Sequence, residues 1–391
     1  MSSFSINNKK AENNSFSAEK MNTSSFDTSF LIIIVLLCGI GIAALFSSSY
    51  NFADNFFGFP YHFVVRQLIW VTLGSIAAFA ASKISLDLIK RYIPLIMFIS
   101  IVFNLLLFIP GLGIEAGGAR RWLGIGGYSF QPSELIRISL VLYVAKMLEK
   151  NKGKMKDFGN AVIPQMLIIL ISTLIVYSQN DFSSAVLIFS VAFIMLILGG
   201  LNLIIVLIAT VLIGFAAFLM LKVKPYRIRR IVSWLNPESD PSGAGYQVLT
   251  ARNALESGGF WGEGFGQSVM KLGSLPQAHS DFVFAIIGEE TGFLGVIVIF
   301  VLFGLFAWRG YRISIKTDDT FKKYAAFGLT TTVYLQALTN ISVVCGFIPA
   351  TGIPLPLFST GGSTSLITLI IFGLLINISK KDKTGWGRKY E

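Results

Sequence analysis

The sequence predicts an all-α polytopic membrane protein, with about ten transmembrane helices and a long extracytoplasmic loop between helices 7 and 8. The first observation is composition: of 391 residues, 53% are hydrophobic and 14% are charged, whereas soluble domains carry about 25% charged residues. The second is a series of apolar runs of bilayer length, and the third is the placement of lysine and arginine between them. Together they exclude a soluble enzyme.

Ten stretches are predicted as spans, because a helix needs about 20 mostly apolar residues to cross the hydrocarbon core. In chain order they are 30–49, 62–82, 92–109, 133–148, 161–178, 182–198, 201–221, 282–308, 324–344 and 363–378. The fourth is short and contains Glu134, Arg137 and Lys146.

Lysine and arginine set the orientation, since short cytoplasmic loops carry an excess of them. With a cytoplasmic N-terminus, the inner segments hold 20 of the 32 such residues, and the short outer loops hold Arg120 and Arg121. The long outer segment holds six more between Lys224 and Ser280, but the rule loses force near that length. We therefore predict a multi-pass membrane protein with both termini in the cytoplasm.

The chain divides into a membrane domain and two tails. We predict a disordered cytoplasmic tail at 1–29, a ten-helix domain at 30–379 that includes the large extracytoplasmic loop at 222–281, and a cytoplasmic tail at 380–391. The first tail is rich in Ser, Asn and Lys and lacks an apolar signal region, so we do not interpret it as a cleaved signal. A docking segment for a partner is the alternative.

Charge and cysteine content exclude other classes. The net charge of +11 is explained by membrane topology, and no nucleic-acid-binding motif accompanies it. Cys38 and Cys345 both lie in apolar runs, which argues against a disulfide framework. No zinc-ligand spacing is present, and His62 and His279 are the only histidines.

Three charged side chains fall within or beside spans, where ionisable groups are costly and mark functional sites. Glu134 and Arg137 are spaced i, i+3, so they share a helix face and can pair. The alternative is that the pair only neutralises itself. Asp181 precedes the sixth span, where it either binds substrate or caps the helix.

The outer loop before the fourth span contains Arg120 and Arg121. The planar guanidinium fork suits phosphate and pyrophosphate oxygens, so an anionic lipid head group is a natural ligand; generic contact with the lipid surface is the alternative. In the long loop, Arg227, Arg229 and Arg230 form a basic run, which usually marks a solvated face. The glycine-rich stretch at 258–266 lacks the ending of a phosphate-binding loop.

The end of the long loop carries the strongest chemical signal. Asp281 lies at the predicted outer membrane edge, two residues after His279 and ten after Lys271. A carboxylate in this setting can serve as general base on a hydroxyl. The alternative is a structural cap on the eighth span.

The last outer segment, 346–363, is rich in glycine and proline and ends in Ser359, Gly361, Gly362 and Ser363. Non-helical backbone at membrane depth is tolerated only against protein or a cavity, so this segment is predicted to line one. The amides that open the following helix can hold an anion.

Several of these motifs, in this order, resemble the SEDS family, which comprises FtsW, RodA and SpoVE. They are GARRWL (118–123), QPSE (131–134), YQ (246–247), the glycine-rich stretch, LPQAHSDF (275–282), GEE (288–290), PLP (354–356) and GGS (361–363). The likeness covers the chain from the first span to the tenth. Gln247 and QALTN (336–340) resemble the FtsW branch more than the RodA branch.

The resemblance implies a peptidoglycan glycosyltransferase that polymerises lipid II at the outer face of the plasma membrane during division or elongation. It also implies a class B penicillin-binding transpeptidase as partner. Asp281 falls on the family's essential aspartate and would act as general base, with inversion at the donor carbon. Arg120, Arg121 and Lys271 would then bind the leaving pyrophosphate. A divalent cation such as Mg²⁺ or Mn²⁺ is allowed but has no visible ligand cluster.

Two other functions stay open. A transporter that flips lipid II would also use the buried Glu134 and Arg137 and the broken segment near Pro354, because discontinuous helices mark many transporter sites. A non-catalytic scaffold of the division machinery would act through its tails. Asp281 discriminates between them, since neither alternative requires a carboxylate at the outer surface.

Overall fold

The computed structural model describes residues 27–116, 119–125, 128–202, 204–208, 210–211, 214, 225–240, 243–272, 275 and 278–380. The predicted tails lie outside the described residues, apart from residues 27–29 and 380, and so does most of the predicted seventh span.

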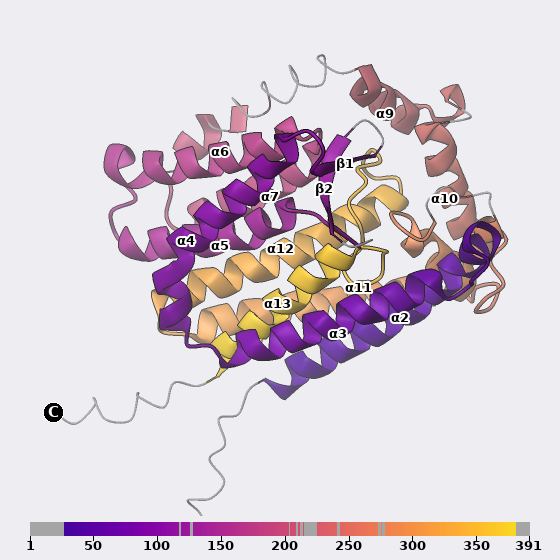
Figure 1. Ribbon diagram of the computed structural model, residues 1–391, viewed down its shortest axis with the longest axis horizontal. Helices are drawn as coiled ribbons and strands as arrows, with labels where there is room; N and C mark the ends of the chain where they lie inside the picture. The colour runs from indigo at the N-terminus through magenta and orange to yellow at the C-terminus, as the bar shows by residue number, and fades with distance from the viewer. Residues whose placement is uncertain are drawn as a thin grey trace, which may run out of the picture.

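The described part of the chain is mostly helical (Figure 1). The long helices are α2 (Thr28–Phe57), α3 (His62–Lys83), α4 (Leu86–Leu105), α5 (Ser133–Lys150), α6 (Ile163–Ser178), α7 (Phe182–Leu198), α11 (Val283–Lys316), α12 (Thr320–Val344) and α13 (Gly362–Ser379). Short helical turns are η2 (Leu106–Phe108), η3 (Phe158–Val162), η4 (Pro237–Ser239) and η5 (Met270–Leu272). Each predicted span except the seventh coincides with one long helix.

Length and composition qualify six of the described helices as membrane spans: α2, α3, α4 with η2, η3 with α6, α11 and α13. α7 matches its predicted bounds, 182–198, and is apolar but shorter than those six. α5 is more polar because it carries Glu134, Arg137 and Lys146. Its residues are nevertheless largely buried, so other helices surround it instead of lipid.

Polar residues at the predicted boundaries define where helices begin. Asp27 accepts a hydrogen bond from the amide of Phe30 at the start of α2 (3.1 Å), and Asp319 accepts one from Lys322 at the start of α12 (2.7 Å). A carboxylate there satisfies amides that have no partner within the helix. At the other end of α2, Gly58 adopts φ 63°, a left-handed conformation that glycine tolerates without strain.

α12 lies at the centre of the bundle (Figure 1). It contacts α5 and α7 on one side and α11 and α13 on the other, while α13 packs closely on α3. The amide of Asp27 donates to Ser379 Oγ (3.4 Å), so the described chain begins and ends on the same face of the bundle. That arrangement agrees with an even number of spans.

The opposite face carries structure that the sequence did not predict. A three-stranded antiparallel sheet, ordered β1 (Gly113–Ala116), β2 (Ala119–Ile125) and β3 (Tyr128–Phe130), follows η2. Within the long loop predicted at 222–281, α9 (Pro225–Leu235) and α10 (Ala244–Gly258) stand at one end of the bundle (Figure 1). Strands and helices this short give weak periodic signals.

The glycine-rich stretch docks against a break in α11. Gly292 has φ 65° and ψ −165° inside that helix, and the freed amide of Phe293 donates to Gly259 O (2.9 Å). A Cβ on Gly262 would lie 2.3 Å from Glu290 O, so only glycine permits this approach. The glycine-rich stretch therefore makes close backbone contact with α11 and holds the segment that leads to Asp281.

Candidate functional site

A cavity of about 1200 Å³ opens between the ends of α5, α7, α12 and α13, the strand β2, and the segment before α11. Its charged lining residues are Arg121, Glu134, Arg137, Asp181, Arg230 and Asp281. It lies at the ends of these helices opposite to Asp27 and Ser379, so under the predicted topology it faces the outer side. Apolar side chains of α7, such as Val186 and Leu187, form part of the wall.

Asp281 lies half-buried in the wall of this cavity. Its Oδ1 accepts a hydrogen bond from Ser280 Oγ (3.0 Å), and its backbone carbonyl accepts one from Asn340 Nδ2 (2.8 Å). α11 starts at Val283, and its N-cap residue is Phe282, which makes no side-chain capping hydrogen bond. The alternative in which Asp281 caps the eighth span is therefore not what the structure shows.

A turn of backbone keeps the second oxygen of Asp281 uncovered. Gly352 has φ 75°, and a Cβ there would lie 3.5 Å from Asp281 Oδ2. A side chain at residue 352 would therefore stand between that oxygen and the space beside it. The left-handed backbone conformation also favours glycine at this position.

Burial and charge act in opposite directions on Asp281. Burial in the wall raises the pKa of its carboxyl above the usual value, and the Ser280 hydrogen bond and the guanidiniums of Arg230 and Arg121 offset part of that rise. A raised pKa makes the ionised carboxylate a stronger base. Such a group in a cleft is a functional-site candidate.

His279 lines the cavity but is held as a packing residue. Its ring centroid lies 4.6 Å from that of Phe52 and 4.6 Å from that of Phe63, and its carbonyl accepts a hydrogen bond from the amide of Thr360 (3.1 Å). Burial among these rings lowers the pKa of His279 to about 4. The imidazole is therefore neutral near pH 7 and adds no positive charge beside Asp281.

Glu134 and Arg137 form the predicted ion pair on the floor of the cavity, with 2.6 Å between Arg137 Nη2 and Glu134 Oε2. The side chain of Thr364 donates to Glu134 Oε1 (2.9 Å), and Arg137 Nη1 donates to Gln336 Oε1. Arg137 Nε and Nη2 are buried and have no hydrogen-bond partner of suitable geometry among the described residues. The pair is thus only partly satisfied by protein.

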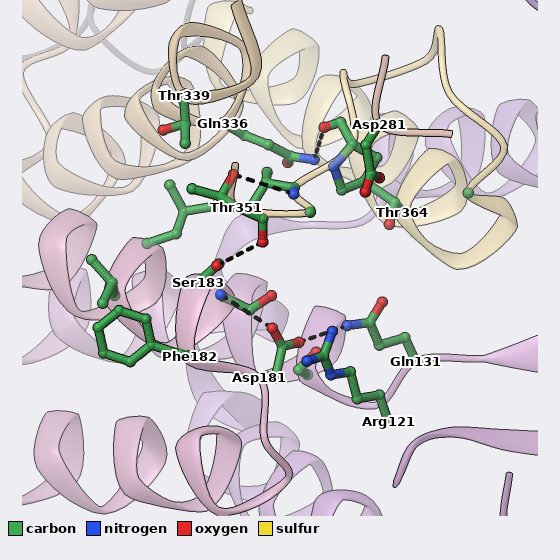
Figure 2. A pocket seen from close by; sticks show the side chains of 18 of the residues that line it. Arg121, Gln131, Asp181, Phe182, Ser183, Asp281, Gln336, Thr339, Thr351 and Thr364 are labelled. Atoms are coloured by element: carbon green, nitrogen blue, oxygen red, sulfur yellow. Dashed lines mark hydrogen bonds between the residues drawn. The ribbon is translucent and has the colours of Figure 1, made fainter. Parts of the chain in front are cut away.

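Arg121 and Asp181 lie across the cavity from Asp281 (Figure 2). Arg121 donates to the carbonyl of Asn180, and its buried Nε has no hydrogen-bond partner in the described structure. Asp181 caps α7 by accepting from the amide of Ser184 (3.3 Å) and also accepts from Gln131 Nε2 (3.0 Å). The capping interpretation of Asp181 is confirmed.

The segment 346–363 lines the cavity as predicted. Gly361, Gly362 and Ser363, at the start of α13, belong to the lining. Ser359 does not: it is buried, and its Oγ accepts from the amide of Leu355 (2.9 Å). That bond closes the turn before α13, so Ser359 shapes the segment instead of facing the cavity.

Two of the predicted cationic residues lie elsewhere. Arg120 is exposed and pairs with Glu115 (3.2 Å), because neighbouring residues of β2 point to opposite faces and Arg121 takes the inner one. Lys271 is buried in an ion pair with Glu290 (2.7 Å) and donates to Ser47 Oγ (3.1 Å). Neither residue lines the cavity.

Arg230, Gln336 and Thr364 line the cavity but were not among the predicted site residues. Arg230 belongs to the basic run interpreted as a solvated face; it donates instead to the carbonyl of Ala350 (2.9 Å). Gln336 carried one available signal, because it is a polar residue about two turns inside an apolar span, whereas Thr364 lies at the start of its span.

The cavity's carboxylates do not form a metal site. Among the described residues, no group of three or more His, Cys, Asp or Glu side chains is placed to hold a metal ion. Glu134, Asp181 and Asp281 each have a different neighbour: a guanidinium, a helix amide and a serine hydroxyl. This donor set does not fit Mg²⁺, which prefers several oxygen ligands in octahedral geometry.

Comparisons with known proteins agree on one family. The family model described as "Cell cycle protein", for FtsW, RodA and SpoVE, matches residues 28–384. A protein of Trichlorobacter lovleyi named probable peptidoglycan glycosyltransferase FtsW is 36% identical over 357 residues, which cover 91% of this chain and 93% of that protein. Stage V sporulation protein E of Bacillus subtilis is 35% identical over 358 residues, covering 91% and 98%.

Solved structures show the same fold. A chain from a peptidoglycan synthase complex that coordinates polymerization and crosslinking superposes with a TM-score of 0.75 at 24% identity, covering 91% of this chain and 98% of that one. The rod shape determining protein RodA of Thermus thermophilus superposes with a TM-score of 0.68 at 23% identity, covering 92% and 98%.

Proposed function

The chain belongs to the family of FtsW, RodA and SpoVE, and we propose that it is a peptidoglycan glycosyltransferase. Its substrate is lipid II, a disaccharide peptide linked through pyrophosphate to a polyprenyl chain. Relatives that cover nine-tenths of the chain carry the glycosyltransferase name. The proposal extends that activity to this chain and gives its residues roles.

One observation carries the proposal: a carboxylate of raised pKa, Asp281, lies in the wall of a large cavity whose other sides hold unsatisfied cationic groups. A polymerase of lipid II needs a base for the acceptor hydroxyl and positive charge for a departing pyrophosphate. The cavity offers both, together with apolar α7 side chains along which a lipid chain can lie.

In the reaction, Asp281 takes the proton from the 4-hydroxyl of the acceptor sugar as that oxygen attacks the anomeric carbon of the donor. A new glycosidic C–O bond forms on the face opposite the leaving group, so the configuration inverts. The bond between the donor carbon and the pyrophosphate oxygen breaks, and its electron pair leaves with the polyprenyl pyrophosphate. A base positioned in this way contributes about 10²- to 10⁴-fold to the rate.

The buried guanidinium atoms without protein partners are the ligands we assign to the pyrophosphate. They are Arg121 Nε and Arg137 Nε, and the amides at the start of α13 add partial positive charge beside them. Buried donors that no protein acceptor satisfies are rare in folded proteins. An anionic substrate would satisfy them and would be stabilised most as negative charge develops on the leaving group.

The orientation of the protein in the membrane is part of the same proposal. The face that carries Asp27 and Ser379 is placed in the cytoplasm, because the inner segments hold most of the lysine and arginine residues. The cavity at the opposite ends of the helices then opens to the outer side, where glycan strands are made. Each step of this reaction uses side chains and backbone amides of the protein, without a metal ion.

The partner we propose is a class B penicillin-binding transpeptidase. The fold matches a chain from a synthase complex in which polymerization and crosslinking are coordinated. Since crosslinking acts on the strand that the polymerase releases, the two active sites serve one product.

The test is polymerisation of lipid II by the purified protein with its transpeptidase in liposomes. We expect the wild-type complex to form glycan strands and Asp281→Asn to form none while retaining its fold. Arg120→Gln is a matched control, because its side chain is exposed outside the cavity. Transfer of lipid II across the bilayer without polymerisation would overturn the assignment in favour of a flippase. Full complementation of a deletion strain by Asp281→Asn would favour a scaffold.

A further inference from the structure

A second, smaller chamber adjoins the substrate cavity at Asp281. It has a volume of about 130 Å³, and its lining includes Gln247 of α10 and Asn340 and Val343 of α12. The two spaces share a wall made of Arg230, Asp281 and residues 350–353. Asp281 therefore borders both spaces.

The chamber contains a polar atom without a protein partner. Asn340 is 1% exposed, and its Nδ2 donates to the carbonyls of Asp281 and Ile353, both at 2.8 Å. Because both carbonyls need a donor, these bonds fix which end of the amide is nitrogen. Its Oδ1 is buried and has no hydrogen-bond partner among the described residues. A buried amide oxygen in a native protein is normally satisfied, by ordered water where no protein donor is present.

Water fits this chamber better than other occupants. The volume of the chamber is several times the space that one water molecule needs. The lining offers acceptors at Asn340 and Asp281 and donors at Arg230 and Gln247, so a water cluster can make the several hydrogen bonds that buried waters require. A metal cation is disfavoured, because the Arg230 guanidinium lies in the same wall.

We propose that this chamber holds ordered water through which the proton taken up by Asp281 leaves the site. This inference rests on the glycosyltransferase function proposed above. During a turnover, the O–H bond of the acceptor breaks and its proton moves to the Asp281 carboxylate. Before the next turnover, that proton must pass to solvent. The substrate cavity is then filled with glycan and lipid, whereas the chamber borders Gln247 and Arg230, both half-buried in the extracytoplasmic helices α10 and α9.

Two guanidiniums and one hydroxyl act on the Asp281 carboxyl. Arg121 from β2 and Arg230 from α9 act on the Asp281 carboxyl from two sides, and Ser280 donates to it. His279 is neutral near pH 7. Water in the chamber is therefore the carrier that we assign to the proton.

Two variants interrupt the water without touching substrate contacts. Gln247→Leu keeps the side-chain size but removes polarity from the chamber, and Val343→Phe fills it. Thr250→Val is the matched control, because it removes a hydroxyl from the same helix, α10, outside the chamber. Membrane abundance, transpeptidase binding and thermal unfolding show whether each variant is folded and assembled.

We expect Gln247→Leu and Val343→Phe, in complex with the transpeptidase, to lower kcat for lipid II polymerisation about tenfold, with KM within about twofold because the substrate cavity is unchanged. The solvent deuterium isotope effect on kcat should rise, and added imidazole should restore part of the rate. Thr250→Val should keep the wild-type values. A merely structural role would not produce buffer rescue.

A folded Gln247→Leu variant with the wild-type kcat and the wild-type isotope effect would overturn the proposal that water in the chamber carries the proton away. If Val343→Phe fails to fold, the Gln247→Leu variant alone tests the role of the chamber. A structure that resolves ordered water should place a peak within hydrogen-bond distance of Asn340 Oδ1; an empty chamber, or a peak with ligand distances of about 2.1 Å typical of Mg²⁺, would also overturn it. Failure of the wild-type complex to polymerise lipid II would instead overturn the proposed function.

Discussion

Removing one member of the Glu134–Arg137 pair should damage the protein more than removing both. The two side chains are 8% and 5% exposed, and their charged atoms lie 2.6 Å apart. At that distance and an effective dielectric constant of about 20, the Coulomb attraction is about 6 kcal/mol. Desolvation of the two ions cancels much of it, so the pair as a whole contributes little net stability.

The single variants Glu134→Gln and Arg137→Gln each leave one buried charge without its counter-ion, and we expect each to lower the free energy of unfolding by about 3 to 5 kcal/mol. The double variant leaves no buried charge and should lose less than either single one. The partly exposed Lys90–Glu149 pair, at 2.5 Å, is the control: Glu149→Gln should change stability by about 1 kcal/mol or less.

Unfolding in detergent, followed by denaturant titration and by thermal scans, measures all four variants in one system. The cycle is informative because the two residues are in contact, so their effects should be strongly non-additive. Additive losses, with the double variant worse than each single variant, would refute the reasoning. Arg137→Gln and the double variant should both polymerise lipid II poorly, since Arg137 is assigned to the pyrophosphate.

Three further outcomes follow from the site. Because burial gives Asp281 a raised pKa, its contribution to stability is present at low pH and is lost as the pH rises through that pKa. Asp281→Asn should therefore unfold at a higher temperature than wild type at pH 8, with the gap closing toward pH 4; a lower unfolding temperature at pH 8 would contradict this sign. Arg121→Gln should reduce kcat/KM for lipid II by about 10- to 100-fold, whereas Arg120→Gln, whose partner is the exposed Glu115, should stay within about twofold; equal losses would refute the assignment. His279→Phe should retain more activity than His279→Ala over pH 6 to 8, because the ring is neutral and packs between two phenylalanines; equal activity of the two variants would show that packing is not its role.

The helices were predictable because hydrophobic length is a local property of the chain. The predicted sixth span and α7 share the bounds 182–198, and Asp181 caps that helix as its position indicated. The spacing of Glu134 and Arg137 likewise required a shared helix face. The family prediction is confirmed by the match over residues 28–384.

The site was only partly predictable, because side-chain direction in irregular segments depends on tertiary contacts. Lys271 is close to Asp281 in sequence, yet it turns toward Glu290. Arg120 and Arg121 differ by one residue, and only the strand β2 decides which one faces inward. Arg230 reaches the cavity because α9 docks through Trp234 Nε1 onto the carbonyl of Gly346 (2.7 Å), a contact between segments more than a hundred residues apart.

The orphaned amide oxygen of Asn340 could not be found from sequence either. Its place follows from two hydrogen bonds to the segments that surround Asp281. Those segments come together only when α10, α11 and α12 are packed. The motif spacing pointed to Asp281 as the proposed base, whereas the two spaces beside it form only when these helices pack together.

The central claim is tested most directly by a structure of the inactive Asp281→Asn variant, in complex with its transpeptidase, with lipid II bound. The account predicts the acceptor hydroxyl within about 3.2 Å of the side chain at 281 and pyrophosphate oxygens on the free guanidinium nitrogens of Arg121 or Arg137. A head group bound away from the cavity, with residue 281 in contact with protein alone, would contradict it.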